Sequence, residues 1–414
     1  MENSSENRRR SDRSSTGPLS GVRILDLSQT LMGPYCTQIL ADLGADVVKI
    51  ESKTGDTTRF IPPGVQSDIG AIFEGLNRGK RSVVLDLKTA TGKEALLCLA
   101  KSADVFLHTM RPQAIERLDL GYDVLSARNS NLIYVNLTGF GSKGPYASYP
   151  AYDDIIQAAS GLTQLQGTLN DGEPSYVSTV LSDKVTGLTA VYAIMAALFS
   201  RSRDGIGQEL NINMFETMTS FVMVEHLSGS LFDPPMGPPE YRRVVSPMRR
   251  PYATADSHIS MMVYNDKQWT NLFAELGEPE WSRASMFSCM RERILHIDMV
   301  YGKLSEIVKE RTTAYWLELC RRAEIPAMPL LSTEDLLSDP HLEEVGFWTE
   351  KESPNGKLRY TGIPTHFSKT PGSIRSSAPA LGADTAEVLK EEGFSQDLID
   401  EVLRGQAVGQ GLDD

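Results

Sequence analysis

Short apolar runs alternate with amphipathic stretches along the first half of the chain. Runs rich in β-branched residues predict strands at 22–27, 46–50, 82–87, 104–107, 132–135 and 207–212. Helical periodicity falls between them, at 35–43, 93–101, 114–117 and 152–161. This alternation predicts a parallel, doubly wound, Rossmann-like α/β sheet. Ligands of such sheets bind beyond the carboxyl ends of the strands, and here the loops at those ends are 28–34, 51–59, 109–112 and 138–145.

One segment stands out because residues 185–200 carry no charge and are apolar or small at almost every position. The pattern predicts a buried helix that is apolar on all sides. At about 16 residues it is shorter than the ~20 needed to span a bilayer. Asp183 stands at the start of this helix, where unpaired N–H groups and the helix dipole favour an ionised carboxylate. These residues alone leave two alternatives for Asp183, a helix N-cap or a catalytic carboxylate.

The character of the chain changes after residue 231. Segment 232–251 is rich in Pro and Arg and predicts a linker. Residues 252–330 predict a smaller α/β domain, with a strand at 258–263 and helices at 269–276 and 313–323. The predicted organisation is a disordered tail at 1–18, a large domain at 19–231 and 351–414, a small domain inserted at 252–330, and linkers at 232–251 and 331–350.

Composition narrows the function classes. The net charge of −13 and the pI of about 5.1 argue against nonspecific binding to nucleic acid. The four cysteines are scattered, so we expect a reduced, cytoplasmic compartment without disulfides. The six histidines are isolated, so we expect no metal site. The N-terminal residues lack an apolar core, so we expect neither a signal peptide nor membrane attachment.

Nucleotide and hydrolase fingerprints are absent. No GxGxxG follows the first strand, and neither GxxxxGK[ST] nor GxSxG occurs. Basic residues instead lie in or near the expected binding loops, at Lys80, Arg111, Arg117 and Lys143. Each alone is as compatible with a solvated surface, but several cations together favour a phosphorylated, nucleotide-like ligand.

Five segments carry a family resemblance that extends from about residue 20 to the C-terminus. They are GVRILDLSQTLMGPYCTQILADLGADVVKIE, LNRGKRSVVLDLKTATGKE, FLHTMRPQAIERLDLGYD, VNLTGFGSKGPYA and LSDKVTGLTAVYAIMAALFSRSRDGIGQELNINMFE. With them the chain resembles the class III CoA-transferases, which include formyl-CoA transferase and carnitine CoA-transferase. The resemblance implies an interlocked homodimer, acyl-CoA and a small carboxylic acid as substrates, and no permanently bound cofactor.

The resemblance also implies a mechanism. The catalytic aspartate of the family falls on Asp183, which attacks an acyl-CoA thioester to form a mixed anhydride. CoA then makes an aspartyl-CoA thioester, from which the acceptor carboxylate takes CoA. This is covalent catalysis by a carboxylate, and it demands exclusion of water. We expect the small Gly187 to let a substrate approach closely.

The family's CoA contacts fall on Lys80, Thr109, Met110, Arg111, Arg117 and Lys143. Many members have Glu-Asn-Phe where this chain has His108-Thr109-Met110, so aromatic stacking on adenine is not expected here. Leu31 replaces a glutamine of formyl-CoA transferase, which disfavours formate or oxalate as substrate.

The acceptor is predicted from residues beside the small domain. We expect Leu31, His226, Arg249 and Arg250 to contact substrate, since an arginine pair can clamp the far carboxylate of a dicarboxylic acid such as succinate. Two alternatives stay open. An α-methylacyl-CoA racemase of the same fold would need a second acid/base group, but Tyr152 stands where those enzymes have histidine and is a poor base near neutral pH. A non-catalytic CoA-binding protein would not need Asp183.

Overall fold

The computed structural model describes residues 16–66, 69–353 and 356–406 of the 414-residue chain. The chain divides into two compact units. The first comprises Met1–Ile156, Val180–Met218 and His341–Asp414, and the second comprises Gln157–Thr179 and Thr219–Pro340. Relative to the predicted boundaries, residues 157–179 and 219–231 group with the second unit, and residues 341–350 group with the first.

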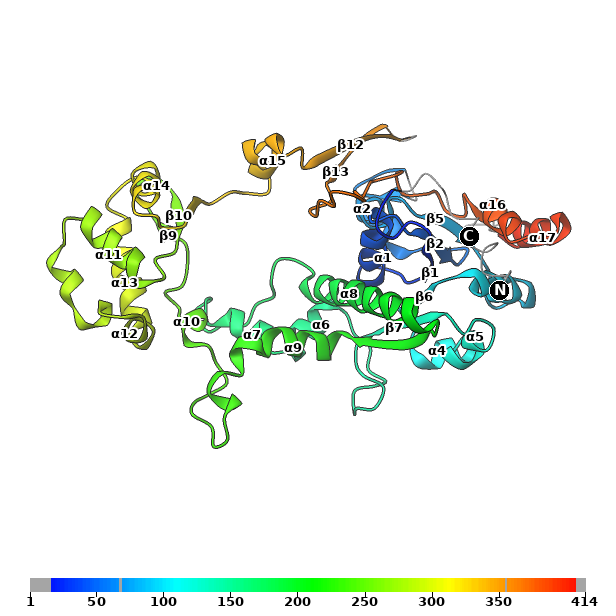
Figure 1. Ribbon diagram of the computed structural model, residues 1–414, viewed down its shortest axis with the longest axis horizontal. Coiled ribbons are helices and arrows are strands. Elements are labelled where there is room, and N and C mark those ends of the chain that lie inside the picture. The colour runs from blue at the N-terminus through cyan, green and yellow to red at the C-terminus, as the bar shows by residue number, and fades with distance from the viewer. Residues whose placement is uncertain (1–15, 67–68, 354–355, 407–414) are drawn as a thin grey trace, which may run out of the picture. The chain divides into compact units, whose positions relative to one another are not determined.

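The first unit is built on a parallel sheet, as the alternating pattern predicts (Figure 1). Its neighbours pair in the order β5-β2-β1-β6-β7-β8, and all pairings among them are parallel. The strands are β1 (Arg23–Leu27), β2 (Asp46–Glu51), β5 (Arg81–Val84), β6 (Val105–His108), β7 (Ile133–Thr138) and β8 (Gln208–Asn213). The chain winds outward from β1 in one direction and then from β6 in the other. The switch point of the sheet therefore lies between β1 and β6, where such folds form a crevice.

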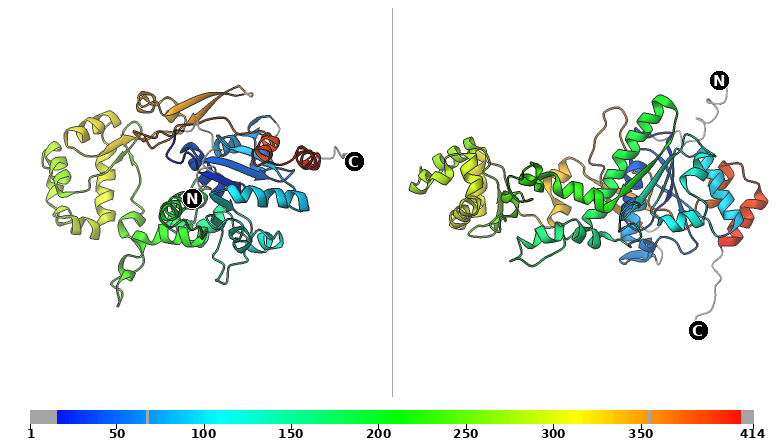
Figure 2. Two further views of the ribbon diagram at one scale, coloured as in Figure 1. Left: turned by 45° about the vertical axis from the view of Figure 1, so that its right-hand side comes forward. Right: turned by 90° about the horizontal axis from the view of Figure 1, so that it is seen from below.

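Helices cover both faces of this sheet. On one face lies the main apolar core, to which β1 contributes Leu25 and Leu27. The helices on that face are α3 (Ala90–Ser102), α5 (Tyr122–Ser126), α16 (Thr385–Glu391) and α17 (Gln396–Gln406). On the other face α1 (Met32–Asp42) packs against β1 and β2, and α8 (Leu181–Asp204) packs against β7, β8 and α1. Figure 2 shows α8 running alongside the strands.

Smaller elements complete the first unit. They are η2 (Thr57–Phe60), α2 (Ala71–Asn77), α4 (Pro112–Arg117), the start of α6 (Asp153–Ala159), the hairpin β3 (Gly64–Gln66) with β4 (Ile69–Gly70), α15 (Pro340–Glu344), and the hairpin β12 (Trp348–Ser353) with β13 (Gly356–Thr361). Cys36, Cys98, Cys289 and Cys320 are free thiols.

The second unit has a core of its own, centred on the buried Trp269, Leu304 and Trp316. Its three-stranded sheet is antiparallel, in the order β11 (Ala327–Pro329), β10 (His258–Met261) and β9 (Tyr252–Ala253). The amphipathic helices α11 (Asp266–Glu275), α13 (Ile297–Val308) and α14 (Thr313–Arg322) enclose this core. Helices α7 (Leu162–Gly167), α10 (Arg242–Val245) and α12 (Met290–Leu295), with part of α9 (Met214–His226), belong to the same unit. The predicted strand at 258–263 and helices at 269–276 and 313–323 are present, with ends that differ by a few residues.

The prediction that helix α8 is buried on all sides is wrong for the single chain. The helix has 24 residues, and only one face, which includes Thr186, Gly187 and Ala190, is buried. Its opposite face exposes 48% of Leu188, 65% of Tyr192 and 67% of Phe199. Among the described helices, α8 alone is long and apolar enough to cross a membrane by length and composition, which is weak evidence because a soluble core helix passes the same test.

Candidate active site

Loops at the switch point of the sheet enclose a cavity of about 270 Å³ that contains Asp183. Its walls come from the loops that follow β1, β6 and β7 and from the start of α8. It is lined by residues 29–32, 137–140 and 147–152, with Thr109, Arg111, Gln113, Asp183 and Met214. We call it the aspartate cavity. Three of the four loops predicted from the sequence contribute to it.

A larger cavity of about 560 Å³ lies beyond the carboxyl ends of β1, β2, β5 and β6. It is lined by residues 50–54 and 85–88, with Leu27, Gln29, Thr109, Met110 and Leu118. We call it the outer cavity. Gln29 and Thr109 line both cavities, and the backbone N–H of Gln29 donates to Oγ1 of Thr109 over 3.3 Å. These two residues form a wall between the two cavities, at the switch point.

Asp183 is the third residue of α8, and Val180 occupies the N-cap position without a side-chain cap. The N-cap alternative for Asp183 is therefore wrong. The backbone N–H of Asp183 donates to Oδ1 of Asp153 over 2.9 Å, and Ser182 Oγ donates to the carbonyl of Asp153 over 3.3 Å. Asp153 is itself the first residue of α6 and is 6% exposed. The amino ends of two helices thus bring two carboxylates together.

This pairing changes the electrostatics of Asp183. Burial, followed by the nearby charge of Asp153, raises the pKa of the Asp183 carboxyl from 3.8 to about 7. The prediction that the helix N-terminus favours an ionised Asp183 is therefore wrong for the free protein, because burial and Asp153 favour the protonated form. A carboxyl with a pKa near 7 accepts or donates a proton under ordinary conditions, and perturbed groups of this kind are typical of functional sites.

Gly187 serves a different purpose from the one expected. A Cβ at this position would lie 2.9 Å from the carbonyl oxygen of Met32 and 3.1 Å from Cδ1 of Tyr35. The glycine therefore lets α8 approach α1 closely, one turn after Asp183. The glycine is thus explained by the contact between the two helices and not by access of a substrate. This contact sets the position of α8 against the loop at residues 29–32.

The predicted CoA contacts are distributed unequally. Thr109 lines both cavities, Met110 the outer cavity and Arg111 the aspartate cavity. Arg117 and Lys143 are exposed and do not line either cavity, and Nε of Arg117 donates to the carbonyl of Gln113. Among the described residues of the aspartate cavity, Arg111 is the one Lys or Arg side chain.

Lys80 lies in the core, where the sequence led us to expect a contact with CoA. Its side chain is 0% exposed and forms an ion pair of 3.1 Å with Asp26. Its ammonium also donates to Thr37 Oγ1 over 2.7 Å and to Asn77 Oδ1 over 2.8 Å. The carbonyl oxygen of Pro34 lies 3.1 Å from the ammonium as a fourth acceptor, so its three hydrogens are shared among protein partners and none is left for a ligand. Its role in this structure is to neutralise the buried Asp26.

His108 supports the loop that follows β6. The ring is 1% exposed, its Nδ1 accepts from the backbone N–H of Met110 over 3.2 Å, and its Nε2 lies 3.0 Å from the hydroxyl of Tyr134. Burial lowers the pKa of His108 to about 4, so the ring is neutral. Since Nδ1 accepts, the proton is assigned to Nε2. This contact holds residues 109–111 where both cavities meet.

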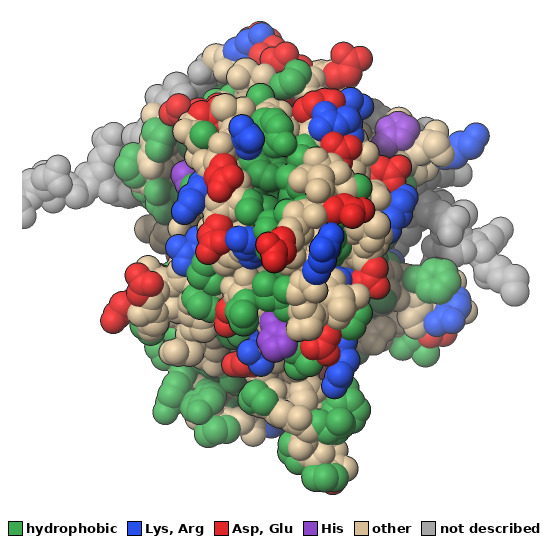
Figure 3. All heavy atoms as spheres, turned by 90° about the vertical axis from the view of Figure 1, so that its left-hand side faces the viewer, with side chains coloured by type: hydrophobic (Ala, Val, Ile, Leu, Met, Phe, Trp, Pro, Cys, Tyr) green, Lys and Arg blue, Asp and Glu red, His purple; other side chains and the backbone are tan. Residues whose placement is uncertain are grey.

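The predicted substrate residues lie in different units. Leu31 lines the aspartate cavity. His226, Arg249 and Arg250 belong to the second unit. His226 is buried and its Nδ1 accepts from the backbone N–H of Tyr241, whereas Arg249 and Arg250 are exposed. One face of the molecule shows Lys and Arg side chains interspersed with Asp and Glu, rather than one basic patch (Figure 3).

Two residues of the site, Gln29 and Asp153, were not identified from the sequence. Gln29 falls in a loop that was expected to bind ligand, but nothing in its residue type marked it. Asp153 stands in the segment Ala151-Tyr152-Asp153-Asp154, which was considered only for the absence of histidine. Asp153 and Asp183 are 30 residues apart, and each stands in the first turn of its helix, α6 or α8. This recurrence of an acidic residue at a helix start is the signal that was available. Among the described residues, no group of three or more His, Cys, Asp or Glu is arranged to hold a metal.

The chain is similar to known proteins over most of its length. The model of CoA-transferase family III matches residues 19–385. The succinate–glutarate CoA-transferase of Agrobacterium fabrum is 32% identical over 386 residues, covering 90% of this chain and 95% of that protein. The formyl-CoA:oxalate CoA-transferase of Shigella sonnei is 30% identical over 419 residues, covering 94% and 99%. The crystal structure of a CAIB/BAIF family protein from Brucella suis matches with a TM-score of 0.75 and 30% identity, covering 91% and 99%.

Proposed function

Because the chain belongs to CoA-transferase family III, we propose that it moves CoA from an acyl-CoA donor to a carboxylic acid through covalent intermediates on Asp183. The observation that carries this proposal is the position of Asp183. Its carboxyl lines a cavity that shares a wall with a larger one at the switch point of the sheet. An acyl-CoA whose nucleotide occupies the outer cavity would place its thioester beyond that wall, beside Asp183.

The reaction divides into four acyl transfers. The Asp183 carboxylate attacks the thioester carbonyl, the C–S bond breaks, and an anhydride and CoA thiolate form. The thiolate attacks the Asp183 acyl carbon, which releases the donor carboxylate and leaves an aspartyl-CoA thioester. The acceptor carboxylate attacks that thioester and forms a second anhydride with release of thiolate. The thiolate then attacks the acceptor acyl carbon, which gives the new acyl-CoA and regenerates the Asp183 carboxylate.

The local environment suits a carboxylate nucleophile. Burial that raises the pKa of Asp183 to about 7 also makes its ionised form poorly solvated, and a poorly solvated carboxylate is a better nucleophile. The apolar part of the wall, which includes Leu31, Met32, Phe140 and Met214, would limit water around the anhydride. Near neutral pH about half of the free enzyme would hold Asp183 in the reactive form.

We place the CoA contacts on Thr109, Met110 and Arg111 around the shared wall, with Lys53 and Lys88 in the outer cavity as additional cations for phosphate. Arg117 and Lys143, both exposed, remain proposed contacts with the mobile parts of CoA. Lys80 is excluded from direct contact by its burial. Lys80 instead stabilises the residues beneath the cavity loops, through its ion pair with Asp26 and a hydrogen bond of 3.1 Å that it donates to the carbonyl of Pro34.

For the acyl group, we propose a small dicarboxylic acid, with succinyl-CoA as donor. The relative from Agrobacterium fabrum is named for two dicarboxylates, succinate and glutarate. The candidates for binding the far carboxylate are Arg111 in the aspartate cavity and Arg249 and Arg250 in the second unit. Leu31 and His226 are the remaining proposed substrate contacts.

We also propose a homodimer. Three large apolar side chains, Leu188, Tyr192 and Phe199, are exposed on one face of α8, and a contiguous apolar face of this kind is typical of a protein interface. A second copy of this chain is the proposed cover, as the family resemblance implies. Light scattering coupled to size exclusion tests this, because the wild-type chain should run as a dimer and Tyr192→Glu should shift it towards monomer. A monomeric wild-type chain would contradict it.

The function is tested by mass spectrometry and by assay. Wild-type protein mixed with succinyl-CoA should gain a covalent adduct of CoA, and Asp183→Asn should gain none and lose transfer by at least about 10³-fold. A panel of mono- and dicarboxylic acids identifies the acceptor. Normal turnover by Asp183→Asn refutes the nucleophile, and exchange of the α-proton of a 2-methylacyl-CoA in D₂O, without transfer, indicates a racemase.

A further inference from the structure

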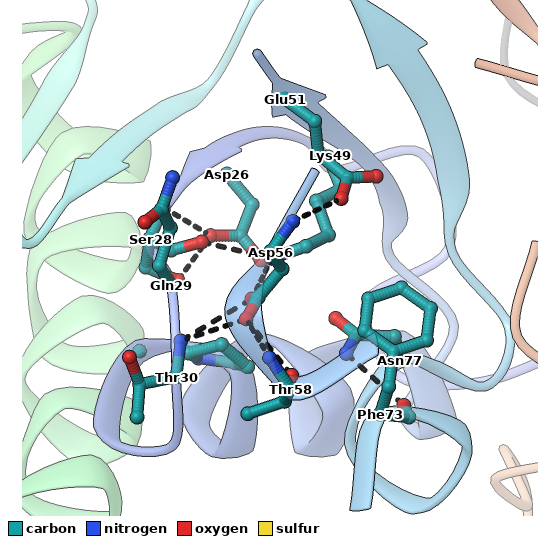
Figure 4. A network of polar contacts seen from close by, with 12 residues as sticks. Asp26, Ser28, Gln29, Thr30, Lys49, Glu51, Asp56, Thr58, Phe73 and Asn77 are labelled. Carbon is teal, nitrogen blue, oxygen red and sulfur yellow. Dashed lines mark hydrogen bonds and ion pairs between the residues drawn. The ribbon is translucent and has the colours of Figure 1, made fainter. Parts of the chain in front are cut away.

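The backbone N–H groups of Ser28, Gln29 and Thr30 each donate to a side chain of a different residue. Figure 4 shows this loop beside two of the acceptors, Asp26 and Asp56. The N–H of Ser28 donates to Asp26 Oδ1 over 2.9 Å, and that of Gln29 donates to Thr109 Oγ1 over 3.3 Å. The N–H of Thr30 donates to both carboxylate oxygens of Asp56, each over 3.2 Å. These partners come from different elements, so the backbone of the loop is held from several sides.

Lys49 joins two of these anchors. Its ammonium donates to the carbonyl of Ser28 over 2.8 Å and forms an ion pair of 3.0 Å with Asp56. The side chains of Lys49 and Asp56 are both 0% exposed. Although burial alone would raise the pKa of Asp56, the charge of Lys49 and hydrogen bonds from Thr58 lower it. Asp56 therefore remains ionised and binds the Thr30 amide with a full charge.

Thr30 adopts a conformation that a β-branched residue avoids. Its φ is +71°, in the left-handed region that favours glycine. A residue keeps such a conformation only where its surroundings impose it. The bonds from the Thr30 amide to the buried Asp56 are the interactions in this structure that do so. Without them, we expect Thr30 to relax and the residue before it to move.

That preceding residue is Gln29, which is exposed and lines both cavities. Its side-chain carboxamide makes no hydrogen bond to any of the described residues. An amide offers both donors and an acceptor, and it matches another amide better than a phosphate or a carboxylate. The loop therefore presents an unused amide at the border that a ligand must cross to reach Asp183.

We propose that the Gln29 carboxamide hydrogen-bonds an amide of the pantetheine chain of CoA as that chain passes between the cavities, and that Asp56 is the positioning residue that holds it there through Thr30. The proposal rests on the proposed function, because it takes CoA as the ligand. It assigns to Gln29 a contact with the middle of CoA, separate from contacts with the nucleotide and with the acyl group.

Calorimetry with two probes tests the contact. CoA contains the pantetheine chain, and adenosine 3′,5′-bisphosphate represents the nucleotide without it. Gln29→Leu should weaken CoA binding by about 3- to 10-fold, the usual effect of one hydrogen bond, and should leave binding of the bisphosphate unchanged. Gln396→Leu, the same change at an exposed glutamine outside both cavities, should alter neither. Unchanged CoA binding by Gln29→Leu, or equal loss with both probes, would overturn the contact.

The positioning role is tested by rescue. Asp56→Asn keeps an acceptor for the Thr30 amide but removes the charge, so it should weaken CoA binding in the same probe-selective way. Adding Thr30→Gly should restore most of that loss, because glycine adopts φ of +71° without help. Failure of Thr30→Gly to restore CoA affinity, or unchanged affinity in a folded Asp56→Asn protein, would overturn the role of Asp56.

The two proposals fail in different ways. If the wild-type chain transfers CoA and Asp183→Asn does not, while Gln29→Leu binds CoA normally, only the pantetheine contact is lost. If wild-type protein binds no CoA, the proposed function fails and the contact with it. If the Asp56 variant does not fold, Gln29→Leu still tests the pantetheine contact, because Gln29 is exposed and its side chain makes no hydrogen bond to the described residues.

Discussion

Asp153 is expected to control the pH at which Asp183 becomes reactive. Asp153→Asn is nearly isosteric, and its amide oxygen can still accept the backbone N–H of Asp183, which now binds the carboxylate over 2.9 Å. The substitution therefore removes one negative charge beside Asp183 with little change of shape. Proton binding by Asp183 should weaken, because its ionised form no longer faces a like charge.

The magnitude follows from the pKa of Asp183. Burial and the charge of Asp153 together raise that pKa from 3.8 to about 7, and burial is the larger cause. Removing the charge should thus recover less than half of the difference, and we expect a shift of about one pH unit. At pH 6 the ionised fraction would rise from about a tenth to about a half, so the rate at low pH should increase by about fivefold.

The assay is the pH profile of kcat/KM for CoA transfer from succinyl-CoA, which reports ionisations of the free enzyme. Wild-type protein should lose activity below pH 7 by about tenfold per unit, and Asp153→Asn should show the same slope with a more acidic midpoint. Asp154→Asn is the matched control, since it removes the same charge from an exposed neighbour in α6. An unchanged midpoint in Asp153→Asn, or an equal shift in Asp154→Asn, would refute the reasoning.

Three further predictions concern stability. Folding raises the pKa of Asp183, so the stability that this group contributes below pH 3.8 is lost as the pH rises through about 7. Asp183→Asn should therefore stabilise the fold by up to about 4 kcal/mol at pH 8 and by less at pH 5, as urea unfolding at both pH values would measure. Equal gains at the two pH values would contradict this. Lys80→Met removes the cation paired with the buried Asp26 and should lower the free energy of unfolding by about 3–5 kcal/mol. Arg117→Met, which removes an exposed cation, should lower it by under about 0.5 kcal/mol. Comparable losses of stability in the two variants would mean that Lys80 is not a core residue. Gly187→Ala should lower the melting temperature and reduce transfer, because the new Cβ would lie 2.9 Å from the carbonyl of Met32. Gly205→Ala is the control, because its loss of stability comes from a φ of +73° and not from the α1–α8 contact, so the folded protein should retain transfer.

The arrangement of the large sheet was predictable because its signal is local. Runs such as residues 22–27 and 46–50 are buried strands, and residues 90–102 between later strands form an amphipathic helix. A parallel sheet follows from that alternation, since each crossover needs a helix. The loops at the carboxyl ends of the strands then follow from topology, and they do enclose the two cavities. The antiparallel sheet of the second unit, with short strands such as β9 and β11, gave no comparable pattern.

The roles of charged residues were less predictable. Lys80, Arg111 and Lys143 all precede or follow strands and looked alike in the sequence, yet one is buried, one lines the aspartate cavity and one is exposed outside it. The difference depends on partners far away in the chain, since Lys80 meets Asp26 only after β1 and the residue before β5 come together. No local pattern contains that information.

Sequence by itself determined the family, the alternation of strands and helices that gives a parallel, doubly wound sheet, and the choice of Asp183 as the candidate nucleophile. Only the tertiary structure showed that Asp153 lies against Asp183 and that Lys80 is buried in the core. It also showed that Thr30 has a left-handed conformation and that Gln29, the residue before it, lies between two cavities. The physical reason is the sequence separation of the interactions involved. Periodicity and motifs record interactions within a few residues, whereas pKa, burial and backbone strain are set by side chains that packing brings together from separate elements.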